Sequence, residues 1–285
     1  MRILLSGKNG QVGSALAQTL ATLGELTAVD RTGLDLRDLT SIGEKIARAK
    51  PDLIVNAAAY TMVDRAERAR SLAFRVNADA VKEIGEAAKA CGALVVHFST
   101  DYVFDGEKPG AYTETDAPNP ISVYGESKLA GERALAASGC RHLVFRTSWV
   151  YGPRGRNFLL VILAAARSKP ELRVVDDQRG APTSSWAIGG AVAQILSHPY
   201  AFSGKAAGIY HMSAAGMTTW YGFAKLIIKR AGLKTPVVPI RSEEYPVAAK
   251  RPRNSLLDNS RLTASFGVAL RDWREDLAAV LAAIH

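Results

Sequence analysis

The sequence is poor in cysteine and in long apolar runs. Its 285 residues include only 2 cysteines, Cys91 and Cys140, which form no CxxC pair. A disulfide framework is therefore excluded, and we expect both thiols to be reduced and partly buried. The longest apolar run, Phe158 to Ala166, is far shorter than the ~20 residues that span a bilayer. The apolar patch after Met1 is too short for a signal peptide, so we expect a cytoplasmic protein with no membrane partner.

The sequence also lacks a basic block, although its formal net charge is +9. The 36 lysines and arginines are spread along the chain and interleave with acidic residues, as in Arg65-Ala66-Glu67-Arg68. Nucleic-acid-binding proteins concentrate such charge in a patch or along one face, so we expect no nucleic-acid partner. The charge fits a solvated basic surface, or a surface that attracts a small polyanionic ligand or cofactor.

Short apolar runs alternate with helical patterns through the first half of the chain. The apolar runs predict strands at residues 2–6, 26–29, 53–55, 93–98 and 142–145. Helical spacing and capping residues predict helices at 10–23, 40–49 and 72–90. Strands that alternate with helices pair in parallel through right-handed crossovers. The sequence therefore predicts an α/β fold with a Rossmann doubly wound parallel sheet.

Beyond Tyr151 the pattern is less regular. It predicts helices at 157–168, 184–197 and 219–231 and a strand at 209–212, and residues 234–259 are rich in proline and polar residues. We expect residues 1–150 to form the Rossmann domain. Residues 151–285 are expected to form mainly a smaller C-terminal substrate-binding lobe, with a segment near 173–200 packing back on the Rossmann domain.

A glycine-rich turn, Gly7-Lys8-Asn9-Gly10-Gln11-Val12-Gly13, joins the first predicted strand to the first helix. Glycines permit a tight turn and a close approach of the backbone to a pyrophosphate at the helix N-terminus. Asp30 ends the second strand, near the ~20-residue spacing of the acid that binds the adenosine ribose. A glycine turn alone also occurs as plain structure. Together with Asp30 it favours NAD(P) binding by residues 1–150.

Tyr124 and Lys128 are at positions i and i+4, behind Pro118, Pro120 and a capping Ser122. They are therefore predicted to share one face in the first turns of a helix. A phenol alone has a pKa of ~10. A cation ~4 Å away at an effective dielectric constant of ~20 contributes about 4 kcal/mol, enough to lower that pKa by ~3 units toward the working pH of a general acid. Alone, the pattern also fits an ordinary surface helix.

Thr100 follows the strand predicted at residues 93–98, at the edge where open α/β sheets bind their ligands. Its hydroxyl can hydrogen-bond a substrate carbonyl, or it can simply cap a turn. The preceding strand ends in Asn56-Ala57-Ala58-Ala59-Tyr60-Thr61, whose small residues suit a cofactor that lies across the sheet edge.

These segments occur in one chain and in order, together with Ser99 to Phe104, Phe145 to Tyr151, Asp177 to Thr183 and Arg251 to Ser255. In this combination the sequence resembles the extended short-chain dehydrogenase/reductases and, more closely, the dTDP-4-dehydrorhamnose reductase family. The resemblance extends from Gly7 to Ser255. It implies a catalytic triad of Thr100, Tyr124 and Lys128.

The resemblance also implies a cofactor and a substrate. The cofactor would be NADPH or NADH, in contact with Gly7, Gly10, Gln11, Val12, Gly13, Asp30, Arg31, Asp35, Leu36, Ala59, Tyr60, Thr61, Phe98, Tyr124 and Lys128. The substrate would be a dTDP-sugar in contact with Thr100, Asp101, Tyr124, Trp149 and Arg251, and with the turn at 180–183. Trp149 equally fits an aromatic core position after a strand.

The choice between the two cofactors depends on two adjacent residues with opposite effects. Asp30 can accept hydrogen bonds from the ribose hydroxyls and repels a 2′-phosphate, which favours NADH. Arg31 can pair with that phosphate, which favours NADPH. We therefore expect both cofactors to be used, with a preference of less than about tenfold, or ~1.4 kcal/mol.

The implied reaction is the reduction of a 4-keto group to give dTDP-L-rhamnose. Tyr124 would donate the proton, Lys128 would lower the phenol pKa and orient the cofactor ribose, and Thr100 would polarise the carbonyl. A dehydratase usually has Asp-Glu after the threonine, and Asp101-Tyr102 argues against that activity. A reductase or epimerase of another nucleotide 4-keto-6-deoxysugar remains an alternative. So does a non-catalytic NADP-binding regulatory subunit that resembles the one of methionine adenosyltransferase.

The resemblance also bears on assembly. Some relatives dimerise around a divalent ion held by glutamates, and Ala15 and Trp186 stand at those places here. Neither side chain can bind a hard cation. We expect no metal site and no requirement for a metal, and a chain that is a monomer or a weak homodimer.

Overall fold

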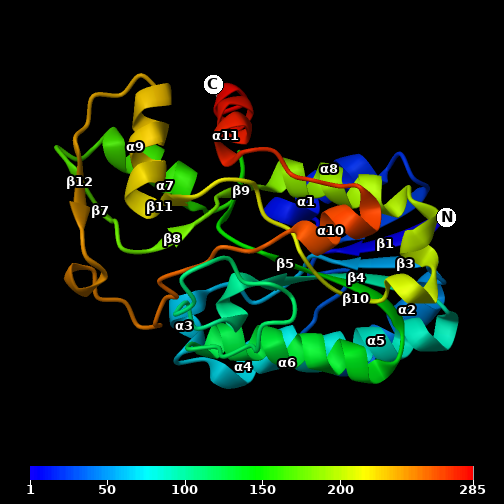
Figure 1. Cartoon of the computed structure of the whole chain (residues 1–285). Helices are drawn as coiled ribbons and strands as arrows, with labels where there is room; N and C mark the ends of the chain where they lie inside the picture. Colours follow the sequence, from blue (N-terminus) through cyan, green and yellow to red (C-terminus); the bar gives the residue numbers. More distant parts are fainter. Residues whose placement is uncertain (285) are drawn as a thin grey trace.

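Six parallel strands form the central sheet of the computed structural model, which describes residues 1–284 (Figure 1). Their order across the sheet is β10-β5-β4-β3-β1-β2. The strands are β1 (Arg2–Ser6), β2 (Glu25–Val29), β3 (Leu53–Asn56), β4 (Leu94–Thr100), β5 (Arg141–Thr147) and β10 (Gly208–His211). Helices cover both faces, which is why the central strands are near-continuous apolar runs. The predicted doubly wound parallel sheet is confirmed.

Two layers of helices enclose this sheet. On one face lie α1 (Gln11–Leu20) and α8 (Ser185–Leu196), which pack against each other. On the other lie α2 (Leu39–Ala49), α5 (Ala80–Cys91) and α6 (Val123–Ser138) (Figure 1). Alternate residues along the strands supply the two cores: Leu94 and Val96 pack on the α1/α8 side, and Val95 on the α2/α5/α6 side.

The strand order reverses at β1, because β2 lies on one side of it and β3 on the other. In such sheets the crevice at the carboxyl ends of the strands beside the reversal is the usual ligand site. Here that crevice is bounded by the turn after β1 and by the Ala57-Ala58-Ala59 segment after β3.

The helix predicted at residues 72–90 contains a segment that the sequence did not indicate. After α4 (Arg70–Phe74), residues Arg75–Asp79 form one π-helical turn, and α5 then continues to Cys91. This turn carries Asn77, and the backbone of α6 at Gly131 packs so closely on Asn77 that a Cβ there would overlap its carbonyl oxygen. Such turns are often found at functional sites.

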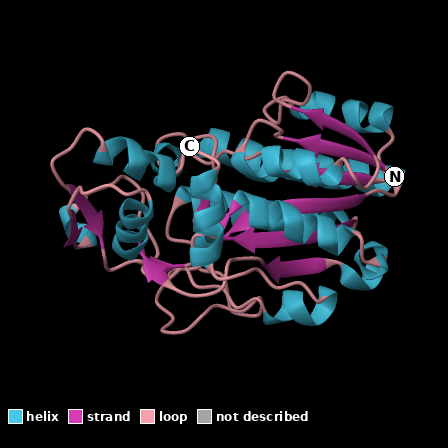
Figure 2. Ribbon diagram, turned by 90° about the horizontal axis from the view of Figure 1, so that it is seen from above, coloured by secondary structure: helices cyan, strands magenta, loops and turns pink. Residues whose placement is uncertain are grey.

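A second, smaller group of elements has its own apolar core, which includes Tyr151, Leu159, Phe223 and Trp273. It is built from α7 (Phe158–Ala166), β7 (Leu172–Val175), α9 (Trp220–Arg230), β12 (Val237–Ile240) and α11 (Trp273–Ala282). Figure 2 shows this lobe beyond the end of the sheet toward which the strand arrows point. β12 pairs in parallel with β7, in a stretch that the sequence indicated only as rich in proline and polar residues.

The remaining elements are short. They are α3 (Val63–Ala66), η2 (Asp101–Val103), β6 (Val150–Tyr151), β8 (Arg179–Gly180), β9 (Thr183–Ser184), η3 (Pro199–Phe202), η4 (Gly204–Ala206), β11 (Thr218–Thr219), η5 (Ser242–Glu244) and α10 (Ser260–Phe266). In the described part of the chain, no helix is both long enough and apolar enough to cross a membrane.

Candidate active site

The glycine turn after β1 lies against the backbone at the end of β3. Gly7 has φ +78°, and a Cβ on it would lie 2.7 Å from the Ala58 nitrogen. A Cβ on Gly13 would overlap the Gly7 carbonyl, to whose oxygen the Gly10 N–H donates at 2.9 Å. No side chain caps the N-terminus of α1, and Gln11 Oε1 is buried without a hydrogen-bond partner. The turn therefore fits a dinucleotide pyrophosphate.

Asp30 follows β2 beside this turn and is tightly held. Its Oδ1 accepts hydrogen bonds from the Thr32 N–H at 3.0 Å and the Thr32 hydroxyl at 2.7 Å, and Asn9 Nδ2 donates to its Oδ2 at 3.2 Å. The hydrogen bonds from Thr32 are the largest cause that lowers the pKa of Asp30, to about 2. The carboxylate is ionised near neutral pH, and the neighbouring Arg31 is exposed.

The other residues expected at the cofactor are in different environments. Both oxygens of Asp35 accept hydrogen bonds from the Arg37 guanidinium, and Leu36 is buried in the core beside α2. Ala59, Tyr60 and Thr61 follow β3 at the sheet edge. Leu36 can thus offer a ligand little more than its backbone.

Thr100 is the last residue of β4, and its hydroxyl contacts the two residues that follow it. Its Oγ1 accepts from the Tyr102 N–H at 3.1 Å and donates to Asp101 Oδ1 at 3.0 Å. Thr100 therefore caps η2, as the simpler interpretation of this residue predicts, and it also faces the Tyr124 hydroxyl. Asp101 Oδ2 is buried without a partner, and burial raises the pKa of Asp101 to about 6.

Tyr124 and Lys128 lie in the first turns of α6, where the Ser122 hydroxyl accepts from the Gly125 N–H at 3.2 Å. Their predicted helical placement is confirmed. Lys128 is only 2% exposed, and its Nζ donates to the Phe98 carbonyl oxygen at 2.6 Å. Burial lowers the pKa of Lys128 to about 8, and the Glu132 carboxylate acts in the opposite direction.

The expected effect of Lys128 on the Tyr124 phenol is not present in this arrangement. Burial raises the pKa of Tyr124 to about 12, the Asp101 charge adds to the rise, and only the hydrogen bond with Thr100 opposes it. The lysine amine is turned toward Phe98 on β4. The estimate from helical spacing assumes an ammonium beside the phenol, but a shared helix face does not determine where a long side chain points.

The residues expected to bind substrate lie between the sheet and the second lobe. Trp149 has φ +49° and stacks on Trp220 of α9, with ring centroids 3.5 Å apart. Arg251 Nη2 forms an ion pair with Asp64 Oδ2 at 2.7 Å and acts electrostatically on Tyr102. Trp220 was not found from the sequence, because its partner Trp149 lies 71 positions away.

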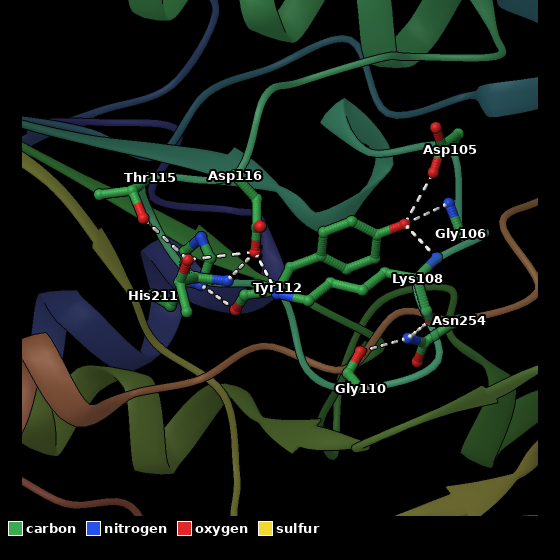
Figure 3. Close-up of polar contacts among 10 residues, drawn as sticks. Asp105, Gly106, Lys108, Gly110, Tyr112, Thr115, Asp116, His211 and Asn254 are labelled. Carbon is green, nitrogen blue, oxygen red and sulfur yellow. Dashed lines mark hydrogen bonds and ion pairs between the residues drawn. The ribbon is translucent and has the colours of Figure 1, made fainter.

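A polar loop after β4 is held by Tyr112, whose hydroxyl accepts from the Gly106 and Lys108 N–H groups and donates to Asp105 (Figure 3). The Tyr112 carbonyl lies 3.0 Å from Nδ1 of His211 on β10, and Figure 3 draws both residues. Asn254 Nδ2 donates to the Lys108 and Gly110 carbonyls at 2.7 Å each. These contacts fix the loop against the strand edge and the C-terminal segment.

Three polar residues at the site were missed from the sequence. Asn77 in the π turn holds Tyr60, since it accepts from the Tyr60 N–H at 2.8 Å and donates to the Tyr60 carbonyl at 3.0 Å. Asn56 and His97, both buried, lie 3.2 Å apart between β1 and Lys128. A signal existed for His97, because it is a polar residue inside the apolar run Leu94-Val95-Val96-His97-Phe98.

These features define an oxidoreductase of the Rossmann type, and comparisons with known proteins identify the family. The family model described as the RmlD substrate binding domain matches residues 1–285. The chain is 45% identical over 285 residues to dTDP-4-dehydrorhamnose reductase from Burkholderia thailandensis, with 96% of each chain covered.

Solved structures agree with this match. The fold is similar to that of a dTDP-4-dehydrorhamnose reductase from Clostridium acetobutylicum, with a TM-score of 0.94 and 35% identity over 100% of this chain and 99% of that one. It is also similar to the enzyme from Bacillus anthracis in complex with NADP, with a TM-score of 0.93 and 32% identity over 99% of each chain. The chain belongs to the dTDP-4-dehydrorhamnose reductase family.

Proposed function

We propose that this protein reduces the 4-keto group of dTDP-4-dehydro-β-L-rhamnose to give dTDP-L-rhamnose, with NADPH or NADH as reductant. The observation that supports the proposal is that Thr100 at the end of β4 faces Tyr124, which shares the first turns of α6 with Lys128. The family to which the chain belongs supports the sugar nucleotide as substrate.

The side chains of this site have distinct tasks in the proposed reaction. Bound NADPH or NADH supplies the hydride. Tyr124, whose raised pKa keeps its hydroxyl protonated, donates the proton to the carbonyl oxygen. Thr100 hydrogen-bonds the same oxygen and so polarises the carbonyl. Lys128 in its protonated form stabilises the tyrosinate that remains, because an ammonium a few ångströms away lowers the pKa of a phenol.

The candidate binding residues form one set for the cofactor and one for the substrate. Gly7, Gly10 and Gly13 would hold the pyrophosphate, and Asp30 and Arg31 would lie at the adenosine ribose. On the substrate side, Asp101 and Trp149 contact the sugar nucleotide. Arg251 pairs with its diphosphate, and to do so it exchanges its ion pair with Asp64 for one with the ligand.

The proposed proton donor is tested by Tyr124→Phe. Loss of a positioned acid costs about 10²–10⁴-fold in turnover. The assay follows NADPH absorbance with dTDP-4-dehydro-β-L-rhamnose. The variant should retain wild-type affinity for NADPH, measured by fluorescence titration. A Tyr124→Phe enzyme that keeps more than a tenth of the wild-type rate would show that Tyr124 is not the proton donor.

The same assay separates the alternatives for the whole protein. Turnover with another 4-keto-6-deoxysugar and not with this one, or a product with the talose configuration, would change the substrate or the epimer. Binding of NADPH without turnover of any such sugar would instead indicate a non-catalytic regulatory subunit.

We further propose that the protein is cytoplasmic and is a monomer or weak homodimer that needs no metal to assemble. Ala15 and Trp186 line a hollow of about 260 Å³ between α1 and α8 and offer no ligand to a cation. Light scattering with and without a chelator tests the assembly. A halved mass after chelation would contradict the proposal.

A further inference from the structure

His97 is a buried histidine at the site to which the proposed reaction assigns no task. It lies on β4 and is 0% exposed. Its Nε2 lies 3.3 Å from Lys128 Nζ, and its Nδ1 lies 3.2 Å from Asn56 Nδ2. A buried imidazole that contacts a buried lysine on one side and an amide on the other can affect the lysine through its tautomer.

The orientation of the Asn56 amide determines that tautomer. The Ala58 backbone N–H, which can only donate, lies 3.3 Å from Asn56 Oδ1. The Ser6 hydroxyl donates to the same oxygen at 2.6 Å. The amide oxygen therefore faces away from His97 and the NH₂ group faces it. Because an NH₂ group only donates, His97 Nδ1 must be the accepting nitrogen.

The single proton of the imidazole must then be on Nε2. Burial, with the Lys128 charge as a lesser cause, holds the pKa of His97 well below its usual value, so the ring is neutral and carries one N–H. That N–H points at Lys128 Nζ. A neutral amine has a lone pair that can accept it, whereas an ammonium has only donors.

We propose that His97 is a positioning residue for Lys128. Fixed as its Nε2–H tautomer by Asn56, it opposes protonation of the lysine while the amine lies against β4. The protonated amine is thereby favoured in a position turned away from β4, toward Tyr124. The other charged group that acts on Lys128 is Glu132 one turn along α6, and His142 on β5 acts on His97.

The tautomer is tested directly by nitrogen NMR of the ligand-free protein labelled in its histidines. The chain has only 5 histidines, and the signals of His97 are identified by their absence from His97→Gln. We expect Nε2 to be protonated, Nδ1 to be unprotonated, and neither to titrate between pH 6 and 9. An Nδ1–H tautomer or a charged ring would overturn the proposal.

The effect on Lys128 is tested by the pH dependence of kcat/KM. Activity falls at alkaline pH as the lysine loses its proton. In His97→Gln the amide can turn its oxygen toward Lys128 and accept from the ammonium, so we expect the alkaline limb to move up by about one pH unit. The shorter side chain of His97→Asn reaches Asn56 but not Lys128, and the substitution removes the Nε2–H that faces the amine. The alkaline limb should therefore also move up, but by less than in His97→Gln.

A matched control is His211→Gln, which changes a second fully buried histidine whose hydrogen bonds are to Tyr112 and Glu114. It should leave the alkaline limb in place, even where it lowers the thermal midpoint. An alkaline limb that stays in place or moves to lower pH in both His97 variants would contradict the proposal. If His97→Gln does not fold, the result with His97→Asn decides. Only the kinetic experiment rests on the proposed function. The NMR result stands even if the substrate proves to be different.

Discussion

Two buried cations lie beside α6, and they are stabilised in different ways: Lys128 is on α6 itself, and Arg146 contacts Glu132 one turn further along that helix. Arg146 on β5 is 2% exposed and forms two hydrogen bonds with the Glu132 carboxylate, at 2.9 and 2.6 Å. Its guanidinium also lies over the Phe104 ring. Lys128 is equally buried, yet its amine contacts only a backbone carbonyl and a histidine.

The difference separates a structural cation from a functional one. A buried charge is stabilised by a well-oriented partner, whereas burial of an ammonium without a carboxylate hydrogen bond lowers its pKa, so that it can change state near the working pH. Lys128 is thus able to gain, lose or redirect its proton. The stability of this region should depend on the ion pair between Arg146 and Glu132, and catalysis should depend on Lys128.

Removal of Glu132 should have the largest effect on stability. Glu132→Leu leaves the Arg146 guanidinium buried without its partner, which typically costs about 3–5 kcal/mol of unfolding free energy. Urea denaturation measures the loss. The double variant Glu132→Leu/Arg146→Met is the control, because it removes both charges and should recover most of the stability. If Glu132→Leu alone is as stable as wild type, the pair is not what stabilises this region.

Lys128→Met should lower activity without lowering stability. We expect a loss of at least about a hundredfold in kcat/KM, or ~2.7 kcal/mol, together with weaker cofactor binding. The stability at pH 7 should be unchanged or higher, since an unpaired buried charge is removed. Parallel kinetics, NADPH titration and urea unfolding test this. If Lys128→Met binds NADPH as tightly as the wild type does, Lys128 does not make the proposed contact with the cofactor ribose.

The pH dependence of the unfolding free energy should distinguish the wild type from Lys128→Met. The folded pKa of Lys128 is lowered to about 8 from a usual value of 10.5, so above pH 8 the unfolded chain binds more protons than the folded one. Unfolding free energy of the wild type relative to Lys128→Met should therefore rise between pH 8 and 10.5, by about 1–3 kcal/mol. A flat difference across this range would mean that the lysine is not desolvated.

Arg31→Ala should give the smallest effect. Arg31 is exposed, so its contact with a 2′-phosphate is screened, and loss of the contact should reduce kcat/KM with NADPH by less than about tenfold. The value with NADH should not change, because Asp30 is held by Thr32 rather than by Arg31. Equal losses with both cofactors would show that Arg31 is only surface charge.

The sequence was sufficient to predict the sheet and the helix that carries Tyr124 and Lys128. Apolar runs and capping residues act locally, and Ser122 caps α6 as its position indicates. The direction of the Lys128 side chain was not predictable, because it depends on His97 and Phe98 from a strand that is distant in sequence. The π turn at Asn77 likewise depends on contacts with Tyr60 and Gly131 that no local pattern encodes.

The most direct test of the functional cation is a titration of Lys128 itself. Its side-chain methylene signal next to the amine can be followed by NMR from pH 6 to 11 and is identified by its absence from Lys128→Met. We predict a midpoint near pH 8, because burial without a carboxylate partner lowers the lysine pKa. A midpoint at 10.5 or above would contradict the distinction between the two cations.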